Sequence, residues 1–266
     1  MSRAKARGVT HLALTDHDTL DGLTAAGRAG QREGVCLVPG IEFSSQWGRS
    51  GVHIVGLAID PDSTELRAAV AKQQEARAQR ARAIAERLAK LGYPDLLEQA
   101  QTFAGPGHLG RPHFAQALVA CGAVKSVAAA FKKYLGAGKL ADVKFAWPSM
   151  DVVIAWIQAA GGLAVLAHPR KYPLTRTKMC ALIGDFAEQG GDAMELISGQ
   201  QPAGTAEDLA RIARHQGLAG SCGSDFHRPN EAWQELGNFG VMPRDCYPVW
   251  EMSAFARTRI DVTLSE

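Results

Sequence analysis

The sequence predicts an α/β fold, either a parallel sheet or a β/α barrel, that is interrupted by an all-helical insertion. Two observations predict this fold class. Short apolar segments of strand length alternate with longer helical segments near both ends of the chain. Between residues 65 and 147 the alternation stops, and only helical patterns follow one another. We therefore expect a barrel formed by residues 1–64 and 148–266, with residues 65–147 as a helical insertion.

The individual elements follow from the apolar patterns and from the turn residues between them. The expected strands are His11–Leu14, Val35–Val38, His53–Leu57, Leu163–Leu166, Ala193–Leu196 and Ala219–Ser221. The helices expected outside the insertion are Leu20–Arg32, Val152–Ala160, Thr177–Gln189 and Thr205–Gln216. Inside the insertion we expect helices at Glu65–Leu91, Arg111–Ala120 and Val124–Tyr134, separated by glycine- and proline-containing turns at 92–94 and 105–107.

Histidine and carboxylate side chains lie at or near the ends of most of these strands. In β/α barrels, the residues that follow the C-terminal ends of strands carry the catalytic groups. Imidazole and carboxylate groups together suit zinc, manganese or iron, and the missing thiolates argue against a structural zinc site. The candidate metal ligands are His17, Glu42, His53, His168, Asp225 and His227.

Each of these side chains also has a structural explanation on its own. Asp16 or Asp18 would serve as the N-cap of the following helix, which is the commoner role for aspartate at such a position. His53 would be a hydrogen-bonded core histidine, and Glu42 a solvated turn residue. Because these explanations must hold independently at equivalent positions of several strands, we favour the metal-site interpretation.

The composition excludes several classes of protein. Hydrophobic residues make up 46% of the 266 residues and charged residues 21%, as in an ordinary globular protein, and the net charge of +2 does not by itself indicate nucleic-acid binding. No apolar run is long enough for a membrane-spanning helix or a signal peptide. The five cysteines are dispersed without a C-x-x-C pair, which indicates reduced thiols and a cytoplasmic location.

Five stretches of the chain resemble the PHP (polymerase and histidinol phosphatase) family of metal-dependent phosphoesterases. In order, they are "LALTDHDTLDG", "LVPGIEFSS", "HIVGL", "LAHP" and "GSDFH". The insertion, with "GRPHFAQALV" and "AFKKYLG", is similar to that of bacterial 3′,5′-nucleoside bisphosphate phosphatases that also act as 5′→3′ exoribonucleases on short RNA. The resemblance implies a distorted (β/α)7 barrel, apparently lacking its first strand, with the insertion as a cap.

One part of the family pattern is missing from this chain. The family begins with a strand that carries a His-x-His pair, followed by an aspartate, and no His-x-His occurs here. Either the chain is a fragment or a gene model with a late start, or the protein truly lacks one strand and part of its metal site. A barrel without its first strand would expose the edges of the neighbouring strands, so we favour a misplaced start.

The resemblance also implies the metal ions and their ligands. Manganese is favoured, with zinc, iron and magnesium as alternatives, and an N-terminally complete form would hold up to three ions. Without the His-x-His pair, the first site loses most of its ligands, whereas the second keeps its full set. The implied ligands are Glu42 and Asp225 for the first ion, Glu42, His53 and His168 for the second, and His17 and His227 for the third.

Several basic side chains are candidates for binding the substrate. Arg111, at the start of a cap helix, would bind a second phosphate bidentately, or would simply be a surface residue. His113 would assist it, and Arg170 and Lys171 would reach the substrate from the segment after His168. The first cap helix is also basic, but its charges are spread around the helix, so a solvated face is favoured over an RNA-binding track. These residues are Arg67, Lys72, Arg77, Arg80, Arg82, Arg87 and Lys90.

The sequence thus leads to the hypothesis of a metal-dependent phosphoric ester hydrolase. It would act on 3′,5′-nucleoside bisphosphates, on short RNA from the 5′ end, or on both, through a metal-bound hydroxide positioned by Glu42, His53, His168 and Asp225. The alternatives are a histidinol-phosphate-type phosphomonoesterase and a non-catalytic PHP-fold module. We expect no recognition of DNA sequence and no membrane association. The native metal, the main substrate and the oligomeric state stay open.

Overall fold

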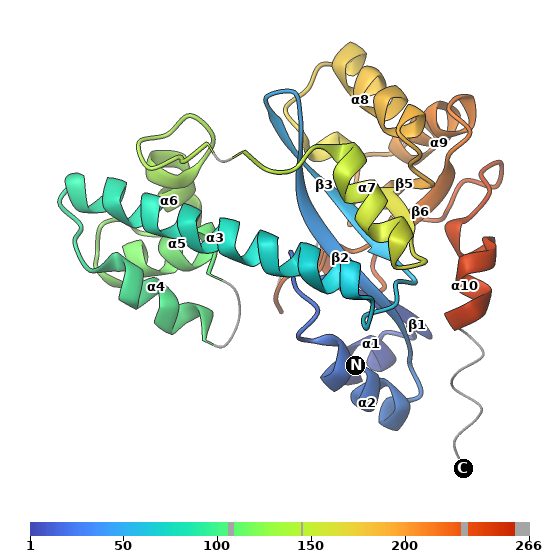
Figure 1. Cartoon of the computed structure of the whole chain (residues 1–266), viewed down its shortest axis with the longest axis horizontal. Coiled ribbons are helices and arrows are strands. Elements are labelled where there is room, and N and C mark those ends of the chain that lie inside the picture. Colours follow the sequence, from blue (N-terminus) through green and yellow to red (C-terminus); the bar gives the residue numbers. More distant parts are fainter. Residues whose placement is uncertain (106–108, 145, 230–233, 259–266) are drawn as a thin grey trace. The chain divides into compact units, whose positions relative to one another are not determined.

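The computed structural model describes residues 1–105, 109–144, 146–229 and 234–258. The chain divides into two compact units (Figure 1). The first consists of Met1–Ala69 and Pro148–Glu266, and the second of Val70–Trp147. Helix α3 (Thr64–Lys90) carries the chain from the first unit into the second. Within the described ranges, no helix is both long enough and apolar enough to cross a membrane.

The first unit is built on one β-sheet of six strands, which lie side by side in chain order. β1 pairs with β2 in parallel, and β4, β5 and β6 also pair in parallel, whereas β3 is antiparallel to both of its neighbours. Every strand except β3 therefore runs in the same direction. The strands are β1 (His11–Leu14), β2 (Cys36–Trp47), β3 (Ser50–Leu57), β4 (Leu163–Leu166), β5 (Ala193–Ser198) and β6 (Ala219–Gly223).

All six predicted strands are confirmed, but the prediction of an all-parallel arrangement is wrong at β3, and β2 is much longer than expected. The sequence indicated a turn at Pro39, where β2 in fact continues. Pro39 lies opposite Leu14, the last residue of β1, so the ladder to β1 ends where proline lacks an N–H. Gly40 is needed there because a Cβ would lie 2.8 Å from Thr15 Cγ2 and 3.0 Å from the Gly56 carbonyl oxygen. Pro39 and Gly40 thus lie within β2, where its pairing passes from β1 to β3, and do not form a turn.

Helices pack against this sheet (Figure 1), and buried apolar side chains form the core of the unit. Helix α2 packs against β2, α7 packs against β2, β3 and β4, and α9 packs against β5 and β6. The four helices predicted outside the insertion are confirmed, with ends that differ by a few residues, and α10 was not predicted. The helices are α1 (Ser2–Ala6), α2 (Leu23–Glu33), α7 (Met150–Ala159), α8 (Arg176–Glu188), α9 (Thr205–His215) and α10 (Ser253–Thr258), with 3-10 turns η2 (Pro169–Lys171) and η4 (Val249–Glu251).

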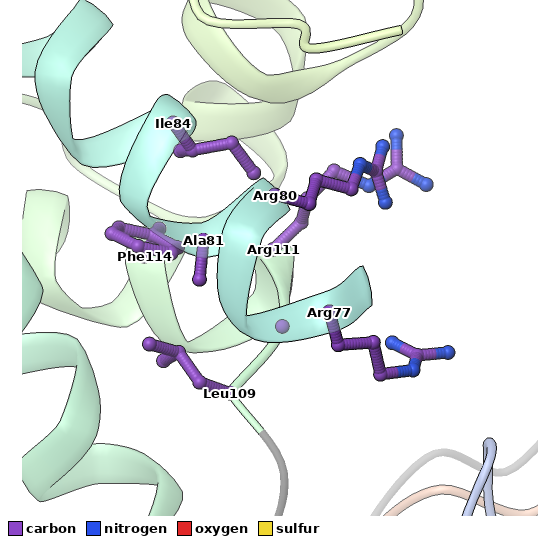
Figure 2. Close-up of a pocket in the computed structure, with 8 residues that line it drawn as sticks. Arg77, Arg80, Ala81, Ile84, Leu109, Arg111 and Phe114 are labelled. Atoms are coloured by element: carbon purple, nitrogen blue, oxygen red, sulfur yellow. The ribbon is translucent and has the colours of Figure 1, made fainter. Parts of the chain in front are cut away.

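The second unit is helical and has a core of its own. Ile84 and Leu88 of α3 pack with Phe114 and Leu118 of α5, and all four side chains are buried. Figure 2 shows Ile84 and Phe114. Helix α5 has the predicted bounds, α4 was not predicted, and the helix predicted at Val124–Tyr134 is a short α-helix followed by a π-helical turn. Part of the turn predicted at 105–107 lies outside the described residues. The elements are α4 (Leu96–Ala104), α5 (Arg111–Ala120), α6 (Val127–Ala130) and η1 (Phe131–Leu135).

Candidate metal centre

The strand directions bring five of the six predicted ligands to one edge of the sheet. β3 runs against the other strands, so its start lies at the same edge as the C-terminal ends of its neighbours. His17 follows β1, His168 follows β4 and Asp225 follows β6, while His53 lies near the start of β3. Glu42 was expected after a strand, but it lies within β2 and pairs with Val55 instead of occupying a solvated turn.

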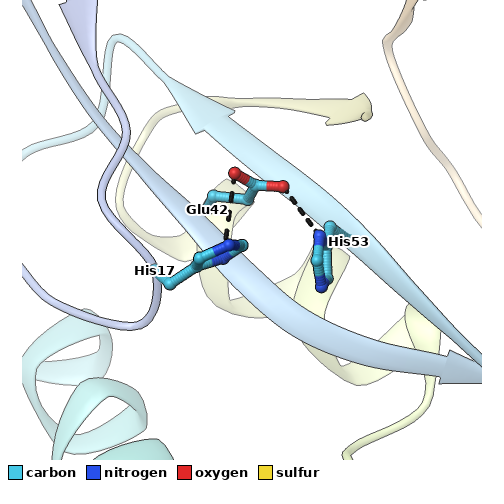
Figure 3. A group of neighbouring side chains, drawn as sticks. All are labelled: His17, Glu42 and His53. Atoms are coloured by element: carbon cyan, nitrogen blue, oxygen red, sulfur yellow. Dashed lines mark ion pairs between the residues drawn. The ribbon is translucent and has the colours of Figure 1, made fainter. Parts of the chain in front are cut away.

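Glu42 is the centre of the cluster, and its carboxylate meets three imidazoles. Oε1 lies 2.9 Å from His53 Nδ1 and Oε2 lies 3.8 Å from His17 Nδ1 (Figure 3). Oε1 also lies 3.0 Å from His168 Nε2. Burial alone would raise the pKa of Glu42, but the charges of His17 and His53 and the hydrogen bonds from His168 and His53 hold it well below its ordinary value. Glu42 is therefore an ionised carboxylate at neutral pH.

The donor atoms form overlapping groups that share Glu42. In two of them, His17 with His53 and His168 with Asp225, the ligand atoms lie within 4.8 Å of one another and of a Glu42 oxygen. Glu42 Oε1, His53 Nδ1 and His168 Nε2 also lie within 3.4 Å of one another. A carboxylate shared between groups of ligands suits centres in which two ions lie about 3.5–4 Å apart.

The chemistry of the donor set fits divalent metal ions. It combines imidazole nitrogens with carboxylate oxygens, the mixture that suits zinc, manganese and iron. Among the described residues, His168 Nδ1 is buried without a hydrogen-bond partner. His168 Nε2 faces Glu42 and His53, so it is the ring nitrogen that the cluster offers to a metal ion.

Two side chains that the sequence analysis did not identify hold His53 and His168 in place. The backbone N–H of His168 donates to Glu195 Oε2 over 2.7 Å. The Tyr172 hydroxyl accepts the N–H of His53 over 2.8 Å and donates to the Ala167 carbonyl over 3.0 Å. Burial raises the pKa of Glu195 to about 7. The only sequence signal for Tyr172 is its position four residues after His168.

Three residues at this edge of the sheet also have strained backbone conformations. His168, Asp225 and Asp18 have φ angles of 30°, 53° and 54°, which non-glycine residues rarely adopt and which tend to occur at functional sites. The N-cap interpretation of Asp18 is wrong, because α2 starts after Gly22 without a side-chain cap. Asp18 is instead fully buried and accepts the backbone N–H of Ser44 over 2.8 Å, which ties the segment after β1 to β2.

Asp225 and His227 lie beside the cluster. Asp225 Oδ2 accepts hydrogen bonds from Lys171 Nζ over 2.5 Å and from Gln234 over 3.1 Å. His227 Nδ1 lies 2.9 Å from the Asp225 carbonyl oxygen, and its ring centroid is 6.1 Å from that of His17. About half of the His227 side chain is exposed, and it belongs to neither group of potential ligands among the residues described.

The predicted substrate-binding residues lie in both units. Arg170 is exposed on the turn after β4. Arg111 is the first residue of α5 and is half-buried, with Nη1 3.4 Å from the Leu135 carbonyl oxygen. His113 Nδ1 accepts the N–H of Gly110 over 3.0 Å, which closes the start of α5, and burial lowers its pKa. Their roles toward a substrate stay predictions.

The chain has close relatives of known activity. It is 40% identical over 251 residues to the 3′,5′-nucleoside bisphosphate phosphatase of Chromobacterium violaceum, which covers 94% of this chain and 88% of that protein. It is 42% identical over 252 residues to the 5′-3′ exoribonuclease Rnm of Escherichia coli, which covers 94% of this chain and 86% of that protein. No family model matches the sequence.

Solved structures resemble the fold as well. The structure of an amidohydrolase from Chromobacterium violaceum, with bound sulfate and no metal, has a TM-score of 0.88 at 40% identity and covers 96% of this chain and 89% of that one. A structure from Bifidobacterium adolescentis, described as a metal-dependent phosphoesterase, has a TM-score of 0.73 at 25% identity and covers 96% and 87%. The chain thus belongs to the family of phosphoric ester hydrolases formed by bacterial 3′,5′-nucleoside bisphosphate phosphatases and 5′-3′ exoribonucleases.

Proposed function

We propose that this chain is a PHP-type hydrolase that uses divalent metal ions, with manganese favoured. Its substrates are 3′,5′-nucleoside bisphosphates, short RNA cleaved from the 5′ end, or both. The observation that carries the proposal is the position of Glu42, a buried carboxylate whose two oxygens face three imidazoles. The names of the relatives favour this function over a histidinol-phosphate-type monoesterase and over a non-catalytic module.

The proposed ligands are His17, Glu42, His53, His168, Asp225 and His227. When bound, divalent ions neutralise the negative phosphate oxygens and lower the pKa of water to give a nucleophile. The protein contributes Glu42 as an anion at neutral pH, since its neighbours hold its pKa low. Glu195 fixes the backbone of His168 and thereby orients the imidazole ring.

Protons compete with metal ions for this cluster. The hydrogen bonds from His53 Nδ1 and His168 Nε2 to Glu42 require a proton on each nitrogen. Burial lowers the pKa of His168, but the hydrogen bond to Glu42 and the charges of Glu42, Glu195 and Asp225 raise it above its ordinary value overall. Metal binding must displace the proton that this raised pKa favours on His168, so metal affinity rises with pH.

The second unit supplies the group for a second phosphate in this proposal. Arg111 is half-buried at the start of α5, and a guanidinium binds a phosphate through two parallel hydrogen bonds. We also propose a cytoplasmic location, which the five free cysteines support.

The test is metal-dependent turnover by the chain and by a Glu42→Gln variant. Phosphate release from 3′-phosphoadenosine 5′-phosphate, and nucleotide release from a 5′-phosphorylated oligoribonucleotide, are measured after chelation and after adding back Mn²⁺, Zn²⁺ or Mg²⁺. Glu42→Gln removes the shared charge, so metal content and rate are expected to fall, the rate by more than about 100-fold. Glu188→Gln, an exposed control on α8, is expected to match the unaltered protein. Full rate after chelation, or in Glu42→Gln, would contradict the proposal.

A further inference from the structure

Helix α1 contacts the segment that carries Asp225 and His227 through one arginine. Arg3 donates two hydrogen bonds to Glu235, from Nε to Oε1 over 2.8 Å and from Nη2 to Oε2 over 2.5 Å. The Glu235 side chain is only 7% exposed. The guanidinium carbon of Arg3 also lies 5.8 Å from the centroid of the Phe226 ring, within the range of cation–π attraction. Arg3 therefore contacts both the residue between the two proposed ligands and a residue further along the chain.

The residue before Glu235 connects this ion pair to the metal centre. Gln234 Nε2 donates to Asp225 Oδ2 over 3.1 Å, and Lys171 Nζ donates to the same oxygen over 2.5 Å. Asp225 contributes an oxygen to one of the two groups of potential ligand atoms. Because Arg3 fixes Glu235, it also fixes the backbone from which Gln234 reaches Asp225.

The backbone of Asp225 needs such contacts. Its φ angle of 53° is strained for a residue other than glycine, and strained conformations persist only where the surrounding structure determines them. The residues after α1 add to this surrounding structure. A Cβ at Gly237 would lie 3.0 Å from Val9 Cγ2 and 3.4 Å from the Arg7 carbonyl oxygen, so the segment that follows Glu235 packs closely against the end of α1.

We propose that Arg3 is a positioning residue of the metal centre, which holds Asp225 in the orientation in which its carboxylate binds a metal ion. One route runs through Glu235 and Gln234, and the other through the ring of Phe226. Hydrogen-bond partners behind a metal ligand typically contribute about 10- to 100-fold to metal affinity. The inference rests on the proposed function for the role of Asp225, and it extends the centre to residues for which the sequence analysis predicted no role.

The test is a calorimetric titration of the complete chain with Mn²⁺. Asp225→Asn first identifies the ion that depends on this carboxylate. In Arg3→Gln, which loses the paired hydrogen bonds to Glu235, we expect this ion to bind about tenfold more weakly. The ligand group without Asp225 is the internal control, and its affinity is expected to stay within about twofold. Lys5→Gln removes the same charge from an exposed position on α1 and is expected to match the unaltered protein.

Two further variants test the route itself. Gln234→Leu leaves the contacts of α1 intact and is expected to weaken the same ion, which also covers the case that Arg3→Gln does not fold. Combined with Arg3→Gln, it is expected to cost less than the product of the two single losses, because both act through one path. Arg3→Lys keeps the charge but not the planar fork and is expected to show an intermediate loss.

Three results would overturn the inference. They are unchanged affinity in Arg3→Gln, equal weakening of every bound ion, which would indicate general loosening of the unit, and losses in the double variant that simply multiply. Absence of Mn²⁺ binding by the unaltered chain would contradict both this inference and the proposed function. Full Mn²⁺ binding without metal-dependent turnover by the unaltered chain would contradict the proposed function alone.

Discussion

At the scale of single residues, the positions of two proposed metal ligands depend on one hydroxyl group. Tyr172 accepts the N–H of His53 and donates to the carbonyl of Ala167, the residue before His168. Tyr172→Phe leaves the N–H of His53 and the carbonyl of Ala167, both in partly buried hydrogen bonds, without this partner. We expect the free energy of unfolding to fall by about 1–3 kcal/mol and the metal affinity to fall by about tenfold or more. Urea unfolding and a manganese titration measure the two effects.

Tyr247→Phe is the matched control for this prediction. The Tyr247 hydroxyl donates to the Glu251 carbonyl over 2.7 Å, but its side chain is largely exposed, so water can replace the lost hydrogen bond. We expect little change in stability or in metal affinity. Equal metal affinity in the two variants would show that Tyr172 does not position the ligands.

The sequence identified the side chains that gather at the sheet edge but not the residues that hold them. His17, His53 and His168 could be singled out because imidazoles near strand ends form a recognisable pattern. Glu195 and Asp18 could not, because their importance lies in hydrogen bonds to backbone groups distant in sequence. Such bonds form only once the strands have paired, so no local sequence pattern predicts them.

At the scale of elements, β2 has no room for a side chain at Gly40, the residue where its pairing passes from β1 to β3. An added Cβ would approach Thr15 Cγ2 to 2.8 Å and two backbone oxygens to 3.0 and 3.1 Å. We expect Gly40→Ala to lower the free energy of unfolding by about 1–3 kcal/mol, because the backbone oxygens cannot move away cheaply. Gly51→Ala in β3 meets nothing within 4 Å and is expected to change stability by less than about 0.5 kcal/mol. Denaturant unfolding compares them, and equal stability would contradict the argument.

A second element, helix α1, is attached to the rest of the first unit by ion pairs. Arg3 donates two hydrogen bonds to Glu235, and Arg7 adds a third over 3.4 Å. The hydrogen bond from Arg3 lowers the pKa of Glu235 to about 2, and this outweighs the effect of desolvation. Because the pKa is lower in the folded chain, the stabilisation is present above the ordinary glutamate pKa and is lost as pH falls toward about 2.

The resulting prediction is a pH-dependent loosening of α1. Hydrogen exchange of the α1 amides, corrected for the intrinsic pH dependence, is expected to accelerate as the pH is lowered through this window. In Glu235→Gln the amides are expected to exchange faster already at neutral pH and to show a much weaker pH dependence. An unchanged pH profile in the variant would mean that other carboxylates, not Glu235, attach the helix.

The element pattern shows where prediction from sequence stops. Strands such as β1 and β4 match their predicted bounds because a compact apolar run marks each of them. The length of β2 could not be predicted, because Pro39 and Gly40 locally indicate a turn, and only the neighbouring strands make them compatible with a strand. The reversed direction of β3 could not be predicted either, because it depends on pairing with β2 and β4. It determines that His53, near a strand start, reaches the edge occupied by residues that follow strand ends.

At the scale of the whole molecule, the two units have separate cores and separate proposed ligands. The core of the second unit is formed by residues 81–143, and the core around β3, β4 and β5 belongs to the first unit. The proposed metal ligands all belong to the first unit, whereas Arg111, proposed to bind a second phosphate, belongs to the second. A ligand that binds a folded unit stabilises that unit by mass action. Each ligand is therefore expected to protect the amides of its own unit against hydrogen exchange.

The last prediction uses this separation. Saturating Mn²⁺, at about 100 times its dissociation constant, is expected to stabilise the first unit by about 2.7 kcal/mol and to slow exchange of amides in β2 to β6 that open by unfolding of this unit. Amides of α4 and α5 are expected to change little. 3′-Phosphoadenosine 5′-phosphate, added without metal, is expected to protect α5, and this protection is expected to be weaker in Arg111→Gln. Hydrogen exchange measured by mass spectrometry distinguishes the two patterns. Protection of α4 and α5 by Mn²⁺ to the same extent as the sheet would contradict independent units and would mean that metal binding is coupled to the unit that carries Arg111.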